Sequence, residues 1–158
     1  MKATNTAPAD RLFGLAWLFF AVALALHVTD EATHNFLSVY NPNALAIRAR
    51  FPFLPVPTFT FATWLTLLAA AIALLFVLTP LAFRCLRWLR IAALPVSILF
   101  GISNACLHLL SSVYYQRLMP GVLSSPILLL AALFLLTAAL RKAKNGTIAI
   151  PSSIAQPS

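Results

Sequence analysis

Four apolar stretches dominate the chain, and each has about the length of a membrane-spanning helix. A helix needs about 20 apolar residues to cross a hydrocarbon layer of roughly 30 Å. The first stretch reaches this length if its helix continues through the polar residues up to Tyr40, and the third contains Pro95, which predicts a kink. The pattern predicts an all-α integral membrane bundle of four transmembrane helices, based on residues 12–26, 58–79, 91–115 and 122–140.

The connections between these stretches carry turn-forming residues. Residues 41–57 are rich in proline, so we expect a loop there with a short interfacial helix. A basic turn ends at Arg90, and a Pro-Gly pair closes the turn at 116–121. The chain is thus expected to comprise an N-terminal cytoplasmic segment, a transmembrane domain and a flexible cytoplasmic tail, at 1–10, 11–140 and 141–158.

The composition agrees with a membrane protein. Of the 158 residues, 61% are hydrophobic and only 9% are charged, and the mean hydropathy is +0.92. A soluble domain carries roughly 25% charged residues to keep its exterior hydrated. The composition therefore excludes a soluble enzyme, a disordered tail and a disulfide-stabilised scaffold. We expect a multi-pass protein of the cell membrane, with the lipid bilayer as its partner.

The positive charge predicts how the chain is oriented. Eleven Lys and Arg residues against three acids give a net charge of +8, but the cations flank apolar stretches and form no basic stripe. Nucleic-acid binding is therefore not expected. Eight of the eleven cations fall in the N-terminal segment, the second connection and the tail. Because positive charge is retained in the cytoplasm, both termini are expected there.

The first apolar stretch also has features of a secretory signal peptide. Lys2 and Arg11 precede the apolar core, and the Ala-Leu-Ala sequence at 23–25 matches a cleavage site. The stretch is long for a signal and its helical pattern continues beyond that site, so we expect it to be retained; cleavage would leave Leu26 as the first residue. A homodimer is left open, because no small-residue motif marks a dimer face.

Ionisable residues are rare and concentrated. The chain has only six His, Asp and Glu residues, and five of them lie in or beside predicted spans. An ionisable group inside a membrane is costly, so it points by default to a functional site. At 100° per residue, His27, Glu31 and His34 fall within about 60° on one face of the first helix, and Asp30 borders that face.

A second polar stripe follows the third predicted helix and is as narrow as the first. Two such stripes on apolar helices are best satisfied by facing each other. Measured from the cytoplasmic ends of their helices, His27 lies about 24 Å deep and His108 about 26 Å deep, which is one level near the outer leaflet. The stripe consists of Asn104, His108, Ser111 and Tyr115.

The segment from His27 to Glu31 reads His-Val-Thr-Asp-Glu and resembles the motif that gives the HXXEE domain family its name. Asp30 stands where the family name has its first Glu, which keeps the charge and shortens the reach of the side chain.

The later part of the chain is similar to a second motif of that family. There an Asn and a His on one helix precede a Pro-Gly turn and a last span, as Asn104, His108 and the Pro-Gly pair at 120–121 do here. The resemblance covers residues 12–140. It implies a small multi-pass membrane protein of several helices and does not imply a reaction.

One hypothesis for this group of residues is a divalent metal site for Zn, Fe or Mn. Imidazole nitrogens and a carboxylate suit these ions, and residues one helical turn apart can share an ion. His27 and His34 are about 10.5 Å apart along the helix axis, so binding by both requires favourable rotamers. The candidate metal ligands are His27, Glu31, His34 and His108.

The same residues also suit chemistry without a metal. A carboxyl group beside imidazoles can perform general acid–base catalysis, here by Glu31 and His108 as candidate catalytic residues acting on a lipid-like or small amphiphilic substrate. Polar neighbours would bind the head of that substrate. The candidate substrate-binding residues are Asp30, Asn104, Ser111 and Tyr115.

Two further interpretations use the same positions. A haem held by His108 and a histidine of the first helix is disfavoured, because no small-residue face would accommodate the macrocycle. Alternatively, the residues form a hydrogen-bonded clasp near the membrane surface, in a transport, structural or interaction protein. The sequence leaves the choice between metal site, acid–base site and clasp open.

Overall fold

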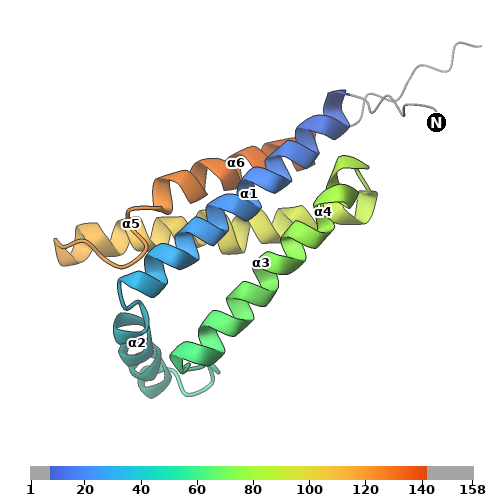
Figure 1. The fold of residues 1–158 in the computed structure, drawn as a ribbon. Helices are drawn as coiled ribbons and strands as arrows, with labels where there is room; N and C mark the ends of the chain where they lie inside the picture. Colours follow the sequence, from blue (N-terminus) through green and yellow to red (C-terminus); the bar gives the residue numbers. More distant parts are fainter. Residues whose placement is uncertain (1–7, 142–158) are drawn as a thin grey trace, which may run out of the picture.

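The computed structural model describes residues 8–141, and the regular structure of that range is entirely helical, as predicted. Figure 1 shows the helices as a bundle with α1 at its centre. The elements are α1 (Pro8–Thr33), α2 (Leu37–Arg50), α3 (Phe61–Phe83), α4 (Arg87–Pro95), the π-helix η1 (Val96–Ser103), α5 (Asn104–Tyr115) and α6 (Ser125–Leu140).

Within the described residues, three helical stretches are long and apolar enough to cross a membrane. They are Arg11–Thr33, Phe61–Phe83 and Arg87–Tyr115. The fourth predicted span is represented by α6, which is apolar but has only 16 residues. It is shorter than predicted because residues 121–124 form a turn and not the first turn of the helix.

The core is built around α1, which packs against α3 on one side and α6 on the other. Phe13, Trp17 and Phe20 of α1 are buried, and the indole N–H of Trp17 donates a hydrogen bond of 2.9 Å to the Leu75 carbonyl of α3. Small residues let the other helices approach closely. Gly101 of η1 is one of them, since a Cβ there would overlap Ala132 and lie 2.9 Å from Phe20.

The third predicted span is one continuous helical stretch with a change of winding. The α-helical pattern ends at Pro95, and a π-helical segment of eight residues follows before α5 begins at Asn104. Proline cannot donate a backbone hydrogen bond, which accounts for an irregularity at this position. Pro95 was predicted to mark a kink, and the structure places there the change from α-helix to π-helix.

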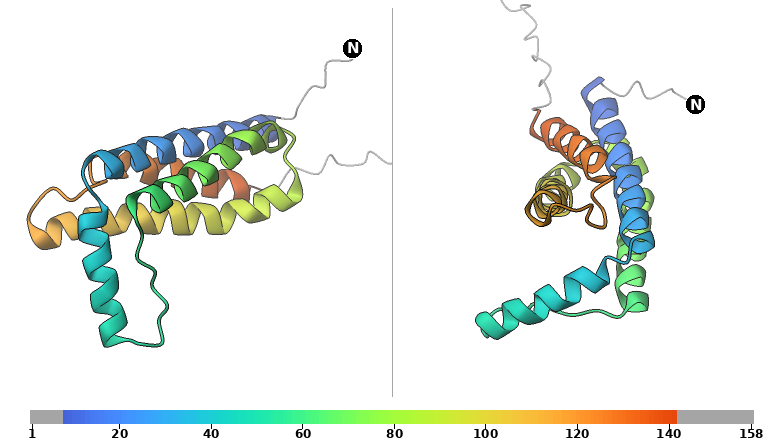
Figure 2. Two further views of the ribbon diagram at one scale, coloured as in Figure 1. Left: turned by 60° about the horizontal axis from the view of Figure 1, so that its bottom comes forward. Right: turned by 90° about the vertical axis from the view of Figure 1, so that its left-hand side faces the viewer.

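The first helix ends earlier than predicted. The prediction continued it to Tyr40, but α1 stops at Thr33, and Asn35 adopts a positive φ of 57° in the turn that follows. The next helix, α2, then extends away from the end of the bundle at a steep angle to α1 (Figure 2). The first part of the predicted loop at 41–57, up to Arg50, is therefore helical.

Hydrogen bonds from α2 fix it to the segment that leads into α3. The amide of Asn41 donates to the Phe59 carbonyl (2.9 Å) and accepts from the Phe59 backbone N–H (3.0 Å). The Tyr40 hydroxyl donates to the Pro57 carbonyl at 3.0 Å. As a result, α2 is held at the end of the bundle at which α1 ends, where its residues share a cavity with polar residues of α5.

We expect Gly101→Ala to lower the free energy of unfolding by about 1–3 kcal/mol, because the added methyl group overpacks the contact of η1 with Ala132 and Phe20. The measurement is thermal unfolding in detergent. Ala69→Leu, which adds more volume on an exposed position of α3, is the control and should leave the melting temperature nearly unchanged. Equal effects of the two changes would contradict this packing.

Candidate metal centre

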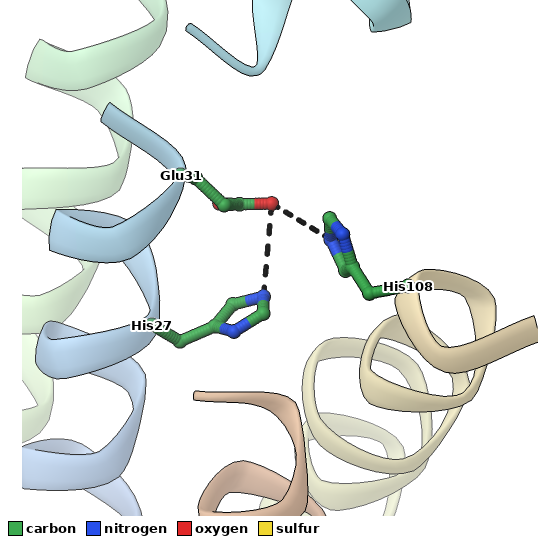
Figure 3. A group of neighbouring side chains, drawn as sticks. All are labelled: His27, Glu31 and His108. Carbon is green, nitrogen blue, oxygen red and sulfur yellow. Dashed lines mark ion pairs between the residues drawn. The ribbon is translucent and has the colours of Figure 1, made fainter. Parts of the chain in front are cut away.

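Three ionisable side chains from two helices meet in the structure. His27 and Glu31 come from α1 and His108 comes from α5, and their candidate ligand atoms all lie within 4.8 Å of one another (Figure 3). Glu31 Oε1 is 2.9 Å from His108 Nε2 and 3.6 Å from His27 Nε2. All three side chains are buried. The two polar stripes predicted on these helices therefore face each other at these residues.

The orientation of the His27 ring is fixed by a contact between its Nδ1 and Ser124. The hydroxyl of Ser124 donates a 2.7 Å hydrogen bond to Asp30 Oδ2, and His27 Nδ1 lies 2.9 Å from the same hydroxyl oxygen. A hydroxyl has a single hydrogen, so the proton between the ring and Ser124 belongs to the ring: His27 Nδ1–H is the donor. In the neutral ring, this tautomer carries its lone pair on Nε2.

That lone pair points to the centre of the group. Within the part of the chain that the structure describes, His27 Nε2 is buried and has no hydrogen-bond partner. Glu31 Oε1 lies 3.6 Å from it, which is longer than a hydrogen bond. A buried polar atom without a partner is costly and calls for an explanation, such as a ligand that completes the site. A histidine whose second nitrogen is held by a hydrogen bond is the usual arrangement of a metal ligand.

The turn before α6 brings Ser124 into position and leaves room for the other two residues. Gly121 has a positive φ of 84°, which favours glycine. A Cβ at this position would lie 2.9 Å from the His108 ring and 3.0 Å from the Cγ of Glu31. Glycine is therefore needed here twice, for the backbone conformation and for the close approach of two site residues.

The ring of His108 is held by aromatic neighbours as well as by Glu31. It meets the ring of His27 edge to face, with centroids 4.9 Å apart, and lies 5.6 Å from the ring of Phe36. These contacts leave its Nε2 directed at the Glu31 carboxylate. The site is thus preorganised by packing on one side and by hydrogen bonds on the other.

His34 does not join this group, in contrast to its prediction as a metal ligand. It lies in the turn that ends α1, its side chain is 54% exposed, and its Nδ1 binds Asp30 Oδ1 at 2.8 Å. The prediction assumed a continuous helix, and the turn removes the ring from the face that carries His27 and Glu31.

Of the four predicted substrate-binding residues, two line the same cavity as His108: Asn104 and Ser111. Tyr115 is 47% exposed and lines a neighbouring cavity, which is also lined by Arg50 and shares Ser111 with the cavity of His108. Asp30 is engaged by Ser124, whose backbone N–H also donates to Oδ2 at 3.0 Å. Asp30 therefore lies on the Nδ1 side of His27, where Ser124 links the two residues, and it does not line the cavity beside His108.

Ser124 and Gly121 were not among the predicted site residues. Ser124 belongs to a third segment, more than 90 residues along the chain from His27, and nothing in the periodicity of α1 or α5 points to it. Gly121 was predicted only as part of a turn. Its sequence signal was the Pro-Gly pair itself, which marks a turn but not the side chains that pack on it.

Two imidazoles and a carboxylate are a ligand set typical of catalytic zinc and related ions. In a tetrahedral site with ligands at about 2.1 Å, ligand atoms are separated by roughly 3.4 Å. The 3.6 Å between His27 Nε2 and Glu31 Oε1 is close to this value, and the 2.9 Å between Glu31 and His108 is somewhat shorter. The group could therefore hold a metal after small movements of the side chains.

The comparison with known families bears on the same residues. The model of a family described as a protein of unknown function with HXXEE motif matches residues 17–136, which is most of the chain. The chain belongs to the HXXEE family. In this HXXEE protein the motif runs from His27 to Glu31, so its first and last residues are the two α1 members of the buried group. No curated protein and no solved structure matches the chain.

The motif position that departs from the family name has its own role in this HXXEE protein. Asp30 has the shorter carboxylate, and it accepts both hydrogen bonds from Ser124 and one ion pair from His34. The two acids of the motif thus have different partners. Glu31 faces His108 across the helix interface, and Asp30 fixes the turn that orients His27.

We expect Ser124→Ala to lower the free energy of unfolding by about 1–3 kcal/mol, because His27 Nδ1 and the Asp30 carboxylate both lose a partner. Thermal unfolding in detergent measures the effect. Ser103→Ala removes the same hydroxyl from an exposed position that makes no hydrogen bond to the described residues, so it should be nearly neutral. An unchanged melting temperature for Ser124→Ala would contradict the assigned hydrogen bonds.

Proposed function

We propose that this HXXEE protein is a membrane-embedded enzyme that binds one divalent metal, Zn, Fe or Mn, through His27, Glu31 and His108, and that it acts on an amphiphilic substrate. The observation that carries the proposal is the buried Nε2 of His27, which lacks a hydrogen-bond partner among the described residues and lies 3.6 Å from Glu31 Oε1, while its Nδ1 is fixed by Ser124. Such a nitrogen is prepared to donate its lone pair.

The composition of the site supports catalysis over a purely structural metal. Structural zinc sites are closed by four protein ligands, whereas catalytic sites keep one position open for substrate or water. The described residues supply three ligands. When bound, the ion would supply Lewis-acid chemistry at that open position. Asn104 and Ser111 line the adjoining cavity and would orient a polar group of the substrate.

A second candidate function has an observation in its favour. The 2.9 Å contact between Glu31 and His108 joins α1 to α5 without any ion. The same geometry would serve as a clasp that fixes helix packing, or as an acid–base pair. A clasp, however, gives no reason for a buried His27 nitrogen without a hydrogen-bond partner among the described residues, and we therefore prefer the metal centre.

Protein purified without chelators is expected to contain close to one equivalent of Zn, Fe or Mn per chain, measured by elemental analysis. His108→Ala and Glu31→Gln should lose most of this metal, because each removes one of three ligands. His34→Ala is the matched control, since it deletes an imidazole outside the group and should retain the metal.

Absence of metal from the wild-type protein, even after addition of these ions, would contradict the metal centre. The melting temperature of Glu31→Gln then separates the remaining alternatives. A clasp predicts that this variant melts several degrees lower. An acid–base pair predicts little change, because catalytic groups are often not optimised for stability.

We also propose that the chain crosses the membrane four times, with both termini in the cytoplasm. The unequal distribution of Lys and Arg supports this orientation. The bundle is compatible with it, because the start of α1 and the end of α6 lie at one end and α2 lies at the other (Figure 1). The fourth crossing would be made by α6, which is about 24 Å long at 1.5 Å per residue.

Reporter fusions in a bacterial host test this topology. We expect a fluorescent protein fused after Ser158 to be fluorescent and alkaline phosphatase at the same position to be inactive. Alkaline phosphatase fused after Phe53, which follows α2, should be active, because it would be exported. The opposite pattern would invert the orientation, and activity at both positions would exclude an even number of crossings.

A further inference from the structure

Two cavities meet at the proposed metal centre. The first has a volume of about 390 Å³ and extends between α3 and the η1–α5 stretch. The second, of about 310 Å³, lies between α5 and α2. They share Phe36, Asn104 and Leu107, and the first is bordered by Glu31 and the second by His108. A single elongated molecule could occupy both cavities and pass the site.

The first cavity is apolar and opens toward lipid. Apart from Glu31 and Asn104, its lining residues are hydrophobic. Leu74 of α3 and Leu99 of η1, on opposite sides of it, are 56% and 60% exposed. In a membrane, exposed side chains of this kind contact acyl chains. The cavity is therefore a lateral opening through which an apolar chain could enter without crossing water.

The opening exists because α3 packs along α1, while η1 and α5 pack on α6. The two sides of the bundle are joined at one end by the short turn between α3 and α4. Between them the side chain of Ala71 lines the cavity and fills little of it. The apolar cavity thus follows from the way in which the helices pair.

The second cavity is lined by more polar residues than the first, although apolar side chains also contribute to its lining. Tyr40, Asn43 and Ser111 line it together with Asn104, and none of the described lining residues of either cavity is Lys or Arg. The amide of Asn104 sits where the cavities meet and makes no hydrogen bond to the described residues. An unpartnered amide offers both donors and an acceptor, which suits a neutral hydroxyl, ester or amide group.

We propose that the substrate is a neutral single-chain amphiphile, whose alkyl or acyl chain lies in the cavity between α3 and η1 and whose uncharged head binds Asn104 and Ser111. A phosphate head is disfavoured because no Lys or Arg lines the head cavity within the described chain, and Arg50 lines only the neighbouring cavity. This inference deepens the proposed function, since it names the substrate class of the same site. It does not require the metal for binding of the chain.

The test is photocrosslinking of the full chain in nanodiscs. The probe is a palmitoyl monoacylglycerol that carries a diazirine near the end of its chain, and labelled residues are mapped by mass spectrometry. We expect labels on the lining residues of α3 and η1. Ala71→Trp fills the cavity and should reduce this labelling by at least about fivefold.

Ala70→Trp is the matched control. It places the same side chain one position earlier on α3, at an exposed residue that does not line the cavity, so labelling should remain. Melting temperatures of both variants establish that they are folded. Labels spread evenly over the outward face of α3, or equal labelling of the two variants, would overturn the proposal.

The head of the probe is tested separately. Asn104→Ala should weaken capture of monoacylglycerol roughly three- to tenfold, as expected for one hydrogen bond. The same variant should leave capture of a diazirine-bearing alkane unchanged. A phosphatidylcholine with the same diazirine serves as the two-chain comparison. If it labels the cavity as strongly as monoacylglycerol does, the assignment to a neutral single-chain amphiphile is wrong.

The labelling is carried out with chelator and again with added Zn²⁺, which separates this proposal from the metal centre. Labelling in the cavity with and without metal, blocked by Ala71→Trp, supports the substrate class even if no metal binds. Stoichiometric metal without labelling in the cavity would retain the metal centre and overturn the substrate class.

Discussion

The hydrogen bond between His27 and Ser124 joins the end of α1 to the turn that precedes α6, and it determines how the polar end of the bundle is arranged. A fully buried imidazole must be paired, because a polar group without a partner is expensive in an apolar interior. Satisfying Nδ1 from the turn leaves Nε2 to face the centre of the group. The conformation of this turn depends on Gly121, which lets the Glu31 side chain and the His108 ring come close to its backbone.

The same end of the bundle also resolves the electrostatic problem of acids in an apolar chain. The chain has three acidic residues, and two of them are adjacent in α1. Each has its own partners: Asp30 is bound by Ser124 and His34, and Glu31 by His108. Ionisable side chains in a membrane protein are tolerated when they are paired. The clustering therefore lowers the free-energy cost of placing these acids in an apolar environment. Helices α3 and α6 can then remain free of charged residues.

Much of this arrangement could be predicted from helical periodicity. The all-helical class and the facing of His27, Glu31 and His108 follow from offsets along α1 and α5, and the structure confirms both. The end of α1 could not be predicted, because the polar residues after Thr33 suit a helix as well as a turn. This error placed His34 among the ligands, while Ser124 was missed because tertiary contacts between distant segments leave no periodic signal.

The π-helical winding of η1 bears on how this fold tolerates changes in length. His108 reaches Glu31 only because α5 emerges from η1 with a particular rotation about its axis. Each residue of an α-helix contributes 100° of rotation. An insertion or deletion of one residue within Val96–Ser103 would therefore swing the imidazole of His108 out of the interface toward lipid, although the span would still be long enough to cross the bilayer. Evolutionary drift in this segment is thus constrained in residue number more strongly than in residue type.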